Sequence, residues 1–182
     1  MGIRKSGIST DFTGMWLGTT KPKNAEQAEY IAKLSQLVNT GRPWCLVVGG
    51  TPGNGKSYLA QIAVNTFNDD RDRGGYYVSQ AILQDELRGE REKEHTIRWY
   101  CSRPMLVIDE ISDSDKDWTE YIKTNIESIL IERHRQGLRT VIIGNVTLDR
   151  FVAMFSKRVR DRFREGMVQT MTGPSLRRTY GA

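Results

Sequence analysis

The chain has 182 residues, a length that suits one domain with a full-sized core. No apolar run approaches the length of a membrane span, and the N-terminus lacks the apolar core of a signal peptide. The two cysteines, Cys45 and Cys101, form no C-x-x-C motif, and the two histidines are isolated, so we expect reduced thiols and no zinc site. These features favour a cytoplasmic protein without membrane contact.

The net charge of +5 is concentrated near the C-terminus. Residues 150–182 hold eight basic and two acidic side chains, whereas the other 149 residues are close to neutral. Such a segment suits contact with nucleic acid or with the triphosphate of a neighbouring subunit, and composition alone does not choose between them.

Predicted strands and helices alternate after a polar lead-in. Residues 1–23 read as an extended lead-in, and residues 24–182 as one domain without internal repeat. The first helix, 24–39, begins with Asn24 and Gln27 as a capping box and ends at Gly41. Apolar runs predict strands at 44–48, 76–78, 105–108, 140–143 and 167–170. Further helices are predicted at 58–67, 80–87, 118–133, 147–155 and 156–164, and 88–98 has the mixed charge of a solvated helical face.

This alternation predicts an α/β fold in which five parallel strands are covered by helices on both faces. The most regular amphipathic helix is the one from Trp118 to Arg133. Asp117 and Glu120 are its expected cap, and Gly137 is its expected end.

A phosphate-binding loop lies between the first strand and the next helix. Its sequence fits G-x-x-x-x-G-K-[ST] without a mismatch. The glycines let successive N–H groups surround phosphate oxygens, and the helix N-terminus adds partial positive charge. We expect Lys56 to reach the β- and γ-phosphates and Ser57 to ligate Mg²⁺. The predicted nucleotide-binding residues are Gly50, Thr51, Pro52, Gly53, Asn54, Gly55, Lys56, Ser57 and Tyr58.

Three polar residues follow the third and fourth predicted strands. Asp109 comes directly after a buried strand, where phosphate-loop proteins hold Mg²⁺. Glu110 is placed to deprotonate the attacking water, and Asn145 to orient that water against the γ-phosphate. By contrast, the acidic run that begins at Asp113 is no calcium loop, because its sixth position is Trp118 rather than glycine.

Four motifs together resemble the AAA+ ATPases, in order and spacing: GTPGNGKS, MLVIDE, VIIGN and SKRVRDRF. The last of them looks like that of the DnaC/DnaI helicase loaders and the related IstB transposition ATPases. The resemblance covers about residues 7–178. It implies ATP and Mg²⁺ as cofactors, Asn145 as the first sensor, and Arg162, with Arg158 as second candidate, as an arginine finger.

The resemblance also implies partners: a replicative helicase, single-stranded DNA and further copies of the chain in a ring or spiral. Because Val159 and Phe163 take the apolar side of the helix 156–164, we expect Arg158 and Arg162 to project outward. Loaders of this family usually carry an N-terminal helicase-binding domain, which this sequence does not contain; either that domain has been truncated or the helicase is bound in another way. Nor do we expect a C-terminal helical lid, whose arginine Arg177 or Arg178 would replace.

Two other functions remain open from the sequence. One is an IstB-like helper that acts on duplex DNA and a transposase. The other is a small-molecule kinase with a phosphate loop, against which the Asp109–Glu110 pair argues, because kinases avoid activating water. Candidate DNA contacts are the aromatic pair Trp99 and Tyr100, beside Arg98 and Arg103, and a path through Arg88, Arg91 and Lys93.

Overall fold

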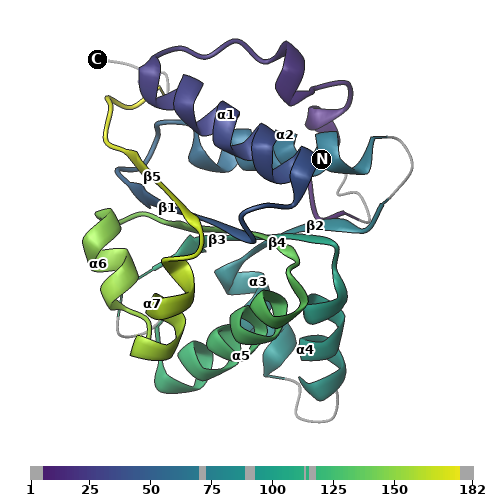
Figure 1. The fold of residues 1–182 in the computed structure, drawn as a ribbon, viewed down its shortest axis with the longest axis vertical. Helices are drawn as coiled ribbons and strands as arrows, with labels where there is room; N and C mark the ends of the chain where they lie inside the picture. Colours follow the sequence, from purple (N-terminus) through teal and green to yellow (C-terminus); the bar gives the residue numbers. More distant parts are fainter. Residues whose placement is uncertain (1–5, 70–72, 89–92, 113, 115–117, 177–182) are drawn as a thin grey trace.

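The central element of the computed structural model is one sheet of five parallel strands (Figure 1). The structure describes residues 6–69, 73–88, 93–112, 114 and 118–176. The strand order is β2-β3-β4-β1-β5, and every adjacent pair is parallel. The predicted α/β fold with five parallel strands is therefore confirmed. The strands are β1 Cys45–Gly50, β2 Gly75–Ser79, β3 Met105–Ile111, β4 Arg139–Gly144 and β5 Met167–Met171.

Helices cover both faces of the sheet in unequal layers (Figure 1). On one face lie α1 Ala25–Thr40 and α2 Lys56–Asn68. The other face carries α3 Gln80–Leu87, α4 Lys93–Ser102, α5 Glu120–Gln136, α6 Leu148–Ala153 and α7 Lys157–Phe163. Along β1, Leu46 and Val48 enter the first core while Cys45 and Val47 enter the second, because alternate side chains of a strand point to opposite faces. In the part of the chain that is described, no helix is long and apolar enough to cross a membrane.

The predicted start and end of α1 are confirmed, but its capping box is incomplete. The Asn24 side chain accepts a hydrogen bond from the N–H of Gln27, and Gly41 ends the helix with φ of 70°. Gln27 does not return a bond to Asn24; its side chain instead contacts Lys23 and Asn54. The side chain of Gln27 therefore contacts residues outside α1 and does not cap its own helix.

The cap of α5 differs from the sequence prediction. Thr119 occupies the N-cap position, and its hydroxyl accepts from the N–H of Ile122. The expected cap, Asp117, lies outside the described residues. Threonine and aspartate can both accept a hydrogen bond from a free N–H group of the first helical turn. The pattern of Asp117 with Glu120 therefore does not determine at which residue α5 begins.

The expectation of an extended lead-in was incomplete. Two 3-10 turns, Thr10–Phe12 and Leu17–Thr19, interrupt it, and both Ile8 and Leu17 are buried in the core beneath α1 and α2. Its backbone also pairs with β2, since the N–H of Tyr77 donates to the carbonyl of Ser6 at 2.9 Å. Isolated apolar residues without period gave no local signal, yet their burial fixes the lead-in on the sheet.

Both edges of the sheet carry such additional contacts. At the β2 edge the lead-in provides the Ser6 carbonyl. At the β5 edge the ammonium of Lys33, from α1, donates to the carbonyl of Val168 at 2.6 Å and pairs with Glu29. The edge strands thus do not present all their backbone groups to solvent.

Among the residues that the structure describes, Arg133 is the largest whose side chain is fully buried. Its guanidinium donates to the hydroxyl of Thr140 and to the carbonyls of Tyr100, Arg103 and Arg139 at 2.6–2.9 Å. Burial lowers its pKa to about 9, so the side chain stays charged at neutral pH. One cation therefore joins α5 to the end of α4 and the start of β4.

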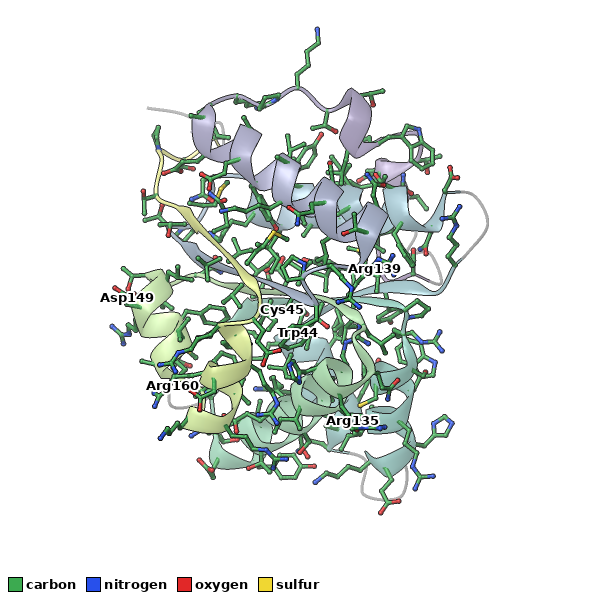
Figure 2. The ribbon with its side chains drawn as sticks, viewed as in Figure 1. Trp44, Cys45, Arg135, Arg139, Asp149 and Arg160 are labelled. Atoms are coloured by element: carbon green, nitrogen blue, oxygen red, sulfur yellow. The ribbon has the colours of Figure 1, made fainter. Side chains whose placement is uncertain are left out.

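We expect Arg133→Met to lower the free energy of unfolding by at least ~3 kcal/mol, because each buried acceptor left unpaired costs about 1–3 kcal/mol. Urea unfolding measures this loss. The control is Arg135→Met, which changes an exposed arginine of the same helix that pairs with Glu132 (Figure 2) and should cost less than ~1 kcal/mol. Equal losses for the two variants would contradict the structural role of Arg133.

Candidate nucleotide-binding site

The phosphate loop runs from the end of β1 to the start of α2. Gly50, Gly53 and Gly55 have φ of 137°, 87° and 94°, values that residues with a side chain rarely adopt. A Cβ on Gly50 would collide with the carbonyl of Met171, and a Cβ on Gly55 would lie 2.7 Å from Nε2 of Gln27. Glycine is required at these positions by both conformation and space.

The ammonium of Lys56 lies within the curl of this loop. The residue is 3% exposed, and its Nζ donates to the carbonyls of Gly50 at 3.2 Å and Thr51 at 2.6 Å and to Oδ1 of Asn54 at 3.3 Å. A phosphate entering the loop would replace these neutral acceptors by a charged one, which forms the stronger hydrogen bond.

The carboxylate of Asp109 lies at the loop end of β3 and is fully buried. Its Oδ1 accepts from the N–H of Glu110 and its Oδ2 from the hydroxyl of Tyr77, both at 2.6 Å. Burial, followed by the negative charge of Asp109, raises the pKa of Tyr77 far above its usual range, so the tyrosine stays a donor. Tyr77 also interacts with the hydroxyl of Ser57 and thereby links it to Asp109.

The strand β3 is longer than predicted and contains both acidic residues. Its regular pairing with β4 is interrupted between Ile108 and Ile111. Within that interruption Glu110 adopts φ of 58°, an uncommon conformation for a residue with a side chain. Asp109 consequently points into the protein while Glu110 is exposed.

A single cavity of about 730 Å³ unites most of the predicted residues. The loop residues from Pro52 to Tyr58 line it together with Glu110 and Asn145. A volume of this size suits a small-molecule or cofactor ligand. The sequence did not reveal the rest of the lining, which comes from the lead-in, α1, α2 and the chain after β5: Gly14, Met15, Thr19, Thr20, Lys21, Lys23, Gln27, Leu59 and Leu176.

The fold matches solved structures of replication proteins. The DnaC helicase loader superposes with a TM-score of 0.74 at 18% identity over 90% of this chain and 100% of that one. DnaI gives 0.73 at 19% identity over 93% and 94%. AMPPCP-bound DnaA from Aquifex aeolicus gives 0.70 at 17% identity over 86% of this chain and 50% of that one. The chain has the AAA+ fold.

Sequence comparison adds nothing to this, since no protein-family model and no curated protein matches the chain. The lead-in, which has no motif of its own, reaches the cavity because it crosses from the β2 edge to the start of α1 and passes the phosphate loop on the way. Burial of Ile8 and Leu17 holds that path.

The donor set at the candidate site fits a magnesium ion bound mainly by phosphates and water. Within the described residues no group of three or more His, Cys, Asp or Glu side chains can hold a metal. The Ser57 hydroxyl and the buried Asp109 carboxylate offer two oxygens, joined through Tyr77. Mg²⁺ accepts such a sparse site because it keeps several waters. When bound, the ion would offset the charge of the phosphates.

The two candidate finger arginines lie on α7 and do not line the cavity. Arg158 is exposed, as predicted. Arg162 is only partly exposed, and its Nη1 donates to the carbonyl of Arg158 at 2.6 Å. Its buried Nε has no hydrogen-bond partner among the described residues. Figure 2 shows Arg160 of the same helix at the outside of the molecule.

The aromatic candidates for DNA contact are structural in part. Tyr100 is fully buried and packs edge-on against Tyr76 and Trp99, so it cannot stack on a base. Trp99 is partly buried, with the guanidinium of Arg103 4.4 Å from its ring. Arg88, Lys93 and Arg98 are at least partly exposed, whereas Arg91 and the lid candidates Arg177 and Arg178 lie outside the described residues.

Proposed function

We propose that this chain is an AAA+ ATPase that hydrolyses ATP to ADP and phosphate. The observation that carries the proposal is the common cavity of the phosphate loop, Glu110 and Asn145 on a fold shared with DnaC, DnaI and DnaA. A nucleotide analogue is bound to the DnaA structure, which supports ATP as the ligand. We treat residues 24–182 as the ATPase domain and residues 1–23 as a lead-in that completes its cavity.

Each residue of the site has a defined part in the proposed reaction. The loop N–H groups and Lys56 bind the phosphates, and Ser57 and Asp109 hold the magnesium ion, Asp109 through water. Glu110 takes a proton from the attacking water, and Asn145 holds that water and the γ-phosphate in line. The division suits the structure, since Asp109 is buried and bonded while Glu110 is exposed to the cavity.

We further propose that the ATPase acts as a helicase loader in the cytoplasm. The support is the match to DnaC and DnaI over nearly the whole length of each chain. A DnaA structure of the same fold is bound to single-stranded DNA, and the basic segment 150–182 suits such a partner here. An IstB-like helper of transposition remains the alternative.

The finger arginine is proposed to act on the ATP of a neighbouring copy in a ring or spiral. Neither Arg158 nor Arg162 lines the cavity of its own chain, which is consistent with a role in trans. Arg158 is exposed and ready for contact, whereas Arg162 has to leave the carbonyl of Arg158. Its unpartnered Nε makes that departure inexpensive.

Lys56→Ala should abolish ATP binding, because it removes the positive charge that binds the phosphates. Equilibrium binding measures this effect. A folded Lys56→Ala variant that holds Mg-ATP as tightly as wild type would refute the proposal.

Glu110→Gln should bind ATP normally and hydrolyse it ~10²–10⁴-fold more slowly, the usual contribution of a general base. Phosphate release measures this effect, with no acceptor present so that a kinase would give no signal. Unchanged turnover in Glu110→Gln would remove that residue from the mechanism.

Mixing Lys56→Ala with an arginine variant tests action in trans. Hydrolysis per chain should rise with protein concentration, and the mixture should regain activity that neither variant has, because a mixed interface pairs an intact loop with an intact finger. A finger in trans can supply ~10³–10⁵ in turnover. Separate mixtures with Arg158→Ala and Arg162→Ala identify the residue. Flat turnover over a wide concentration range together with dead mixtures would exclude the assembly.

The loader role predicts binding to a replicative helicase and to single-stranded DNA. DNA affinity should increase with ATP and fall steeply with salt, because contacts to phosphates release counterions. Fluorescence anisotropy over a salt series measures the DNA arm, and co-purification with a purified replicative helicase measures the other. Preference for duplex DNA and a transposase would favour the IstB-like alternative, and loss of both partners would refute the loader role.

A further inference from the structure

The phosphate loop is held by hydrogen bonds to two of its successive carbonyls. The backbone N–H of Leu176 donates to the carbonyl of Gly53 at 2.8 Å, and Nε2 of Gln27 donates to the carbonyl of Asn54 at 3.0 Å. In a trans peptide the carbonyl and the following N–H point in opposite directions. These two bonds therefore also fix the directions of the N–H groups of Asn54 and Gly55, which belong to the set that binds phosphate.

The side chain of Gln27 is fixed at both ends. Its Oε1 accepts from the N–H of Lys23 at 2.9 Å, so the amide has one orientation and Nε2 is the atom that faces Asn54. The residue is 4% exposed. Gly55 makes this approach possible, because a Cβ there would lie 2.7 Å from Nε2.

The preceding residue, Glu26, reaches the same loop through the segment after β5. We call residues 172–176 the strap. The Glu26 carboxylate accepts from the N–H groups of Thr172 at 3.0 Å and Gly173 at 2.9 Å and from the Thr172 hydroxyl at 3.0 Å. The bond from Gly173 is the largest of the effects that lower the pKa of Glu26. In Figure 1 the chain leaving β5 runs beside the N-terminal end of α1.

The strap in turn contacts two positions of the phosphate loop. Leu176 binds the Gly53 carbonyl, and the Thr51 hydroxyl donates to the carbonyl of Gly173 at 3.5 Å. Ser175 lies so close to Gly53 that a Cβ on that glycine would collide with it. Two adjacent residues of α1 thus act on one loop by separate routes, Gln27 directly and Glu26 through the strap.

We propose that Glu26 and Gln27 are positioning residues of the nucleotide site, which orient the Asn54 and Gly55 N–H groups for the phosphates of the nucleotide. The inference rests on the proposed function and goes beyond it, because it extends the site to the first turn of α1. Neither side chain needs to touch the phosphates for this effect. The loop is ordered before the nucleotide arrives, so less of the binding free energy is lost in ordering it.

The test compares affinities for Mg-ATP, Mg-ADP and adenosine by competition with a fluorescent ATP analogue. Gln27→Glu places a carboxylate oxygen against the Asn54 carbonyl, and Gln27→Met removes the donor without adding charge. We expect Gln27→Met to weaken ATP and ADP about 3–10-fold, the value of one hydrogen bond, and Gln27→Glu to weaken them more. Adenosine affinity should stay unchanged, because adenosine has no phosphate to be bound.

Matched controls come from the same helix. Gln36 also donates its Nε2 to a backbone carbonyl, that of Arg42, but does not line the cavity, so Gln36→Glu should leave all three affinities unchanged. Glu26→Gln should weaken the binding of ATP and ADP by a smaller factor than Gln27→Glu. Glu29 pairs with Lys33 instead of the strap, so Glu29→Gln should leave the binding of both nucleotides unchanged. Thermal unfolding without nucleotide verifies that the variants are folded.

Two results would overturn the inference. One is wild-type affinity for ATP and ADP in both folded Gln27 variants. The other is an equal loss for adenosine and ATP, which would mean that Gln27 merely shapes the whole cavity. A wild-type protein that binds no ATP would refute the proposed function and the inference with it, whereas wild-type binding with unaffected variants would refute the inference alone. The Lys56→Ala variant supplies the baseline for absent phosphate binding.

Discussion

The buried ammonium of Lys56 is the constraint on which the nucleotide site depends. A charge at 3% exposure is costly unless oxygen atoms surround it, and here the loop itself supplies them. The loop can do so only in its strained, glycine-rich path, which further contacts keep in place: the end of β5 through Met171, the tip of β4 through the Val146 carbonyl, and α1 through Gln27. The geometry of the site therefore depends on the strand order, because β1 has to lie between β4 and β5 for both strands to contact the loop.

Local patterns were sufficient to predict the strands of the sheet and to select residues that line one cavity. The four apolar runs before Met167 and the loop from Gly50 to Ser57 carry their signal in consecutive residues, and Asp109, Glu110 and Asn145 follow because parallel strands end at one edge. What the sequence did not reveal depends on contacts between distant segments. Tyr77 is an ordinary strand tyrosine until β2 lies beside β3, and Gln27 is an ordinary helix residue until Asn54 comes within reach.

The difference between local patterns and contacts of distant segments also explains why this chain shares its fold with DnaC, DnaI and DnaA at only 17–19% identity. Apolar character along the strands, glycine at positions of positive φ and a few oxygen and nitrogen atoms at the sheet edge are enough to keep the architecture. Surfaces are under no such constraint. By contrast, the aromatic pair Trp99–Tyr100 belongs to the packed part of the molecule, because its residues lie on α4 and pack against each other and against Tyr76 rather than form an open stacking platform.

The covered edges of the sheet bear on the proposed association between copies of the chain. An open edge strand invites a second molecule to extend the sheet by backbone pairing, a route that is indiscriminate and leads toward aggregation. Here the lead-in supplies a partner at β2, and Lys33 places a positive charge on the backbone of β5. Association by sheet extension is disfavoured at both points, which leaves helix surfaces such as α7. Contacts made by side chains are more selective than backbone pairing, so the covered edges favour specific contacts over aggregation.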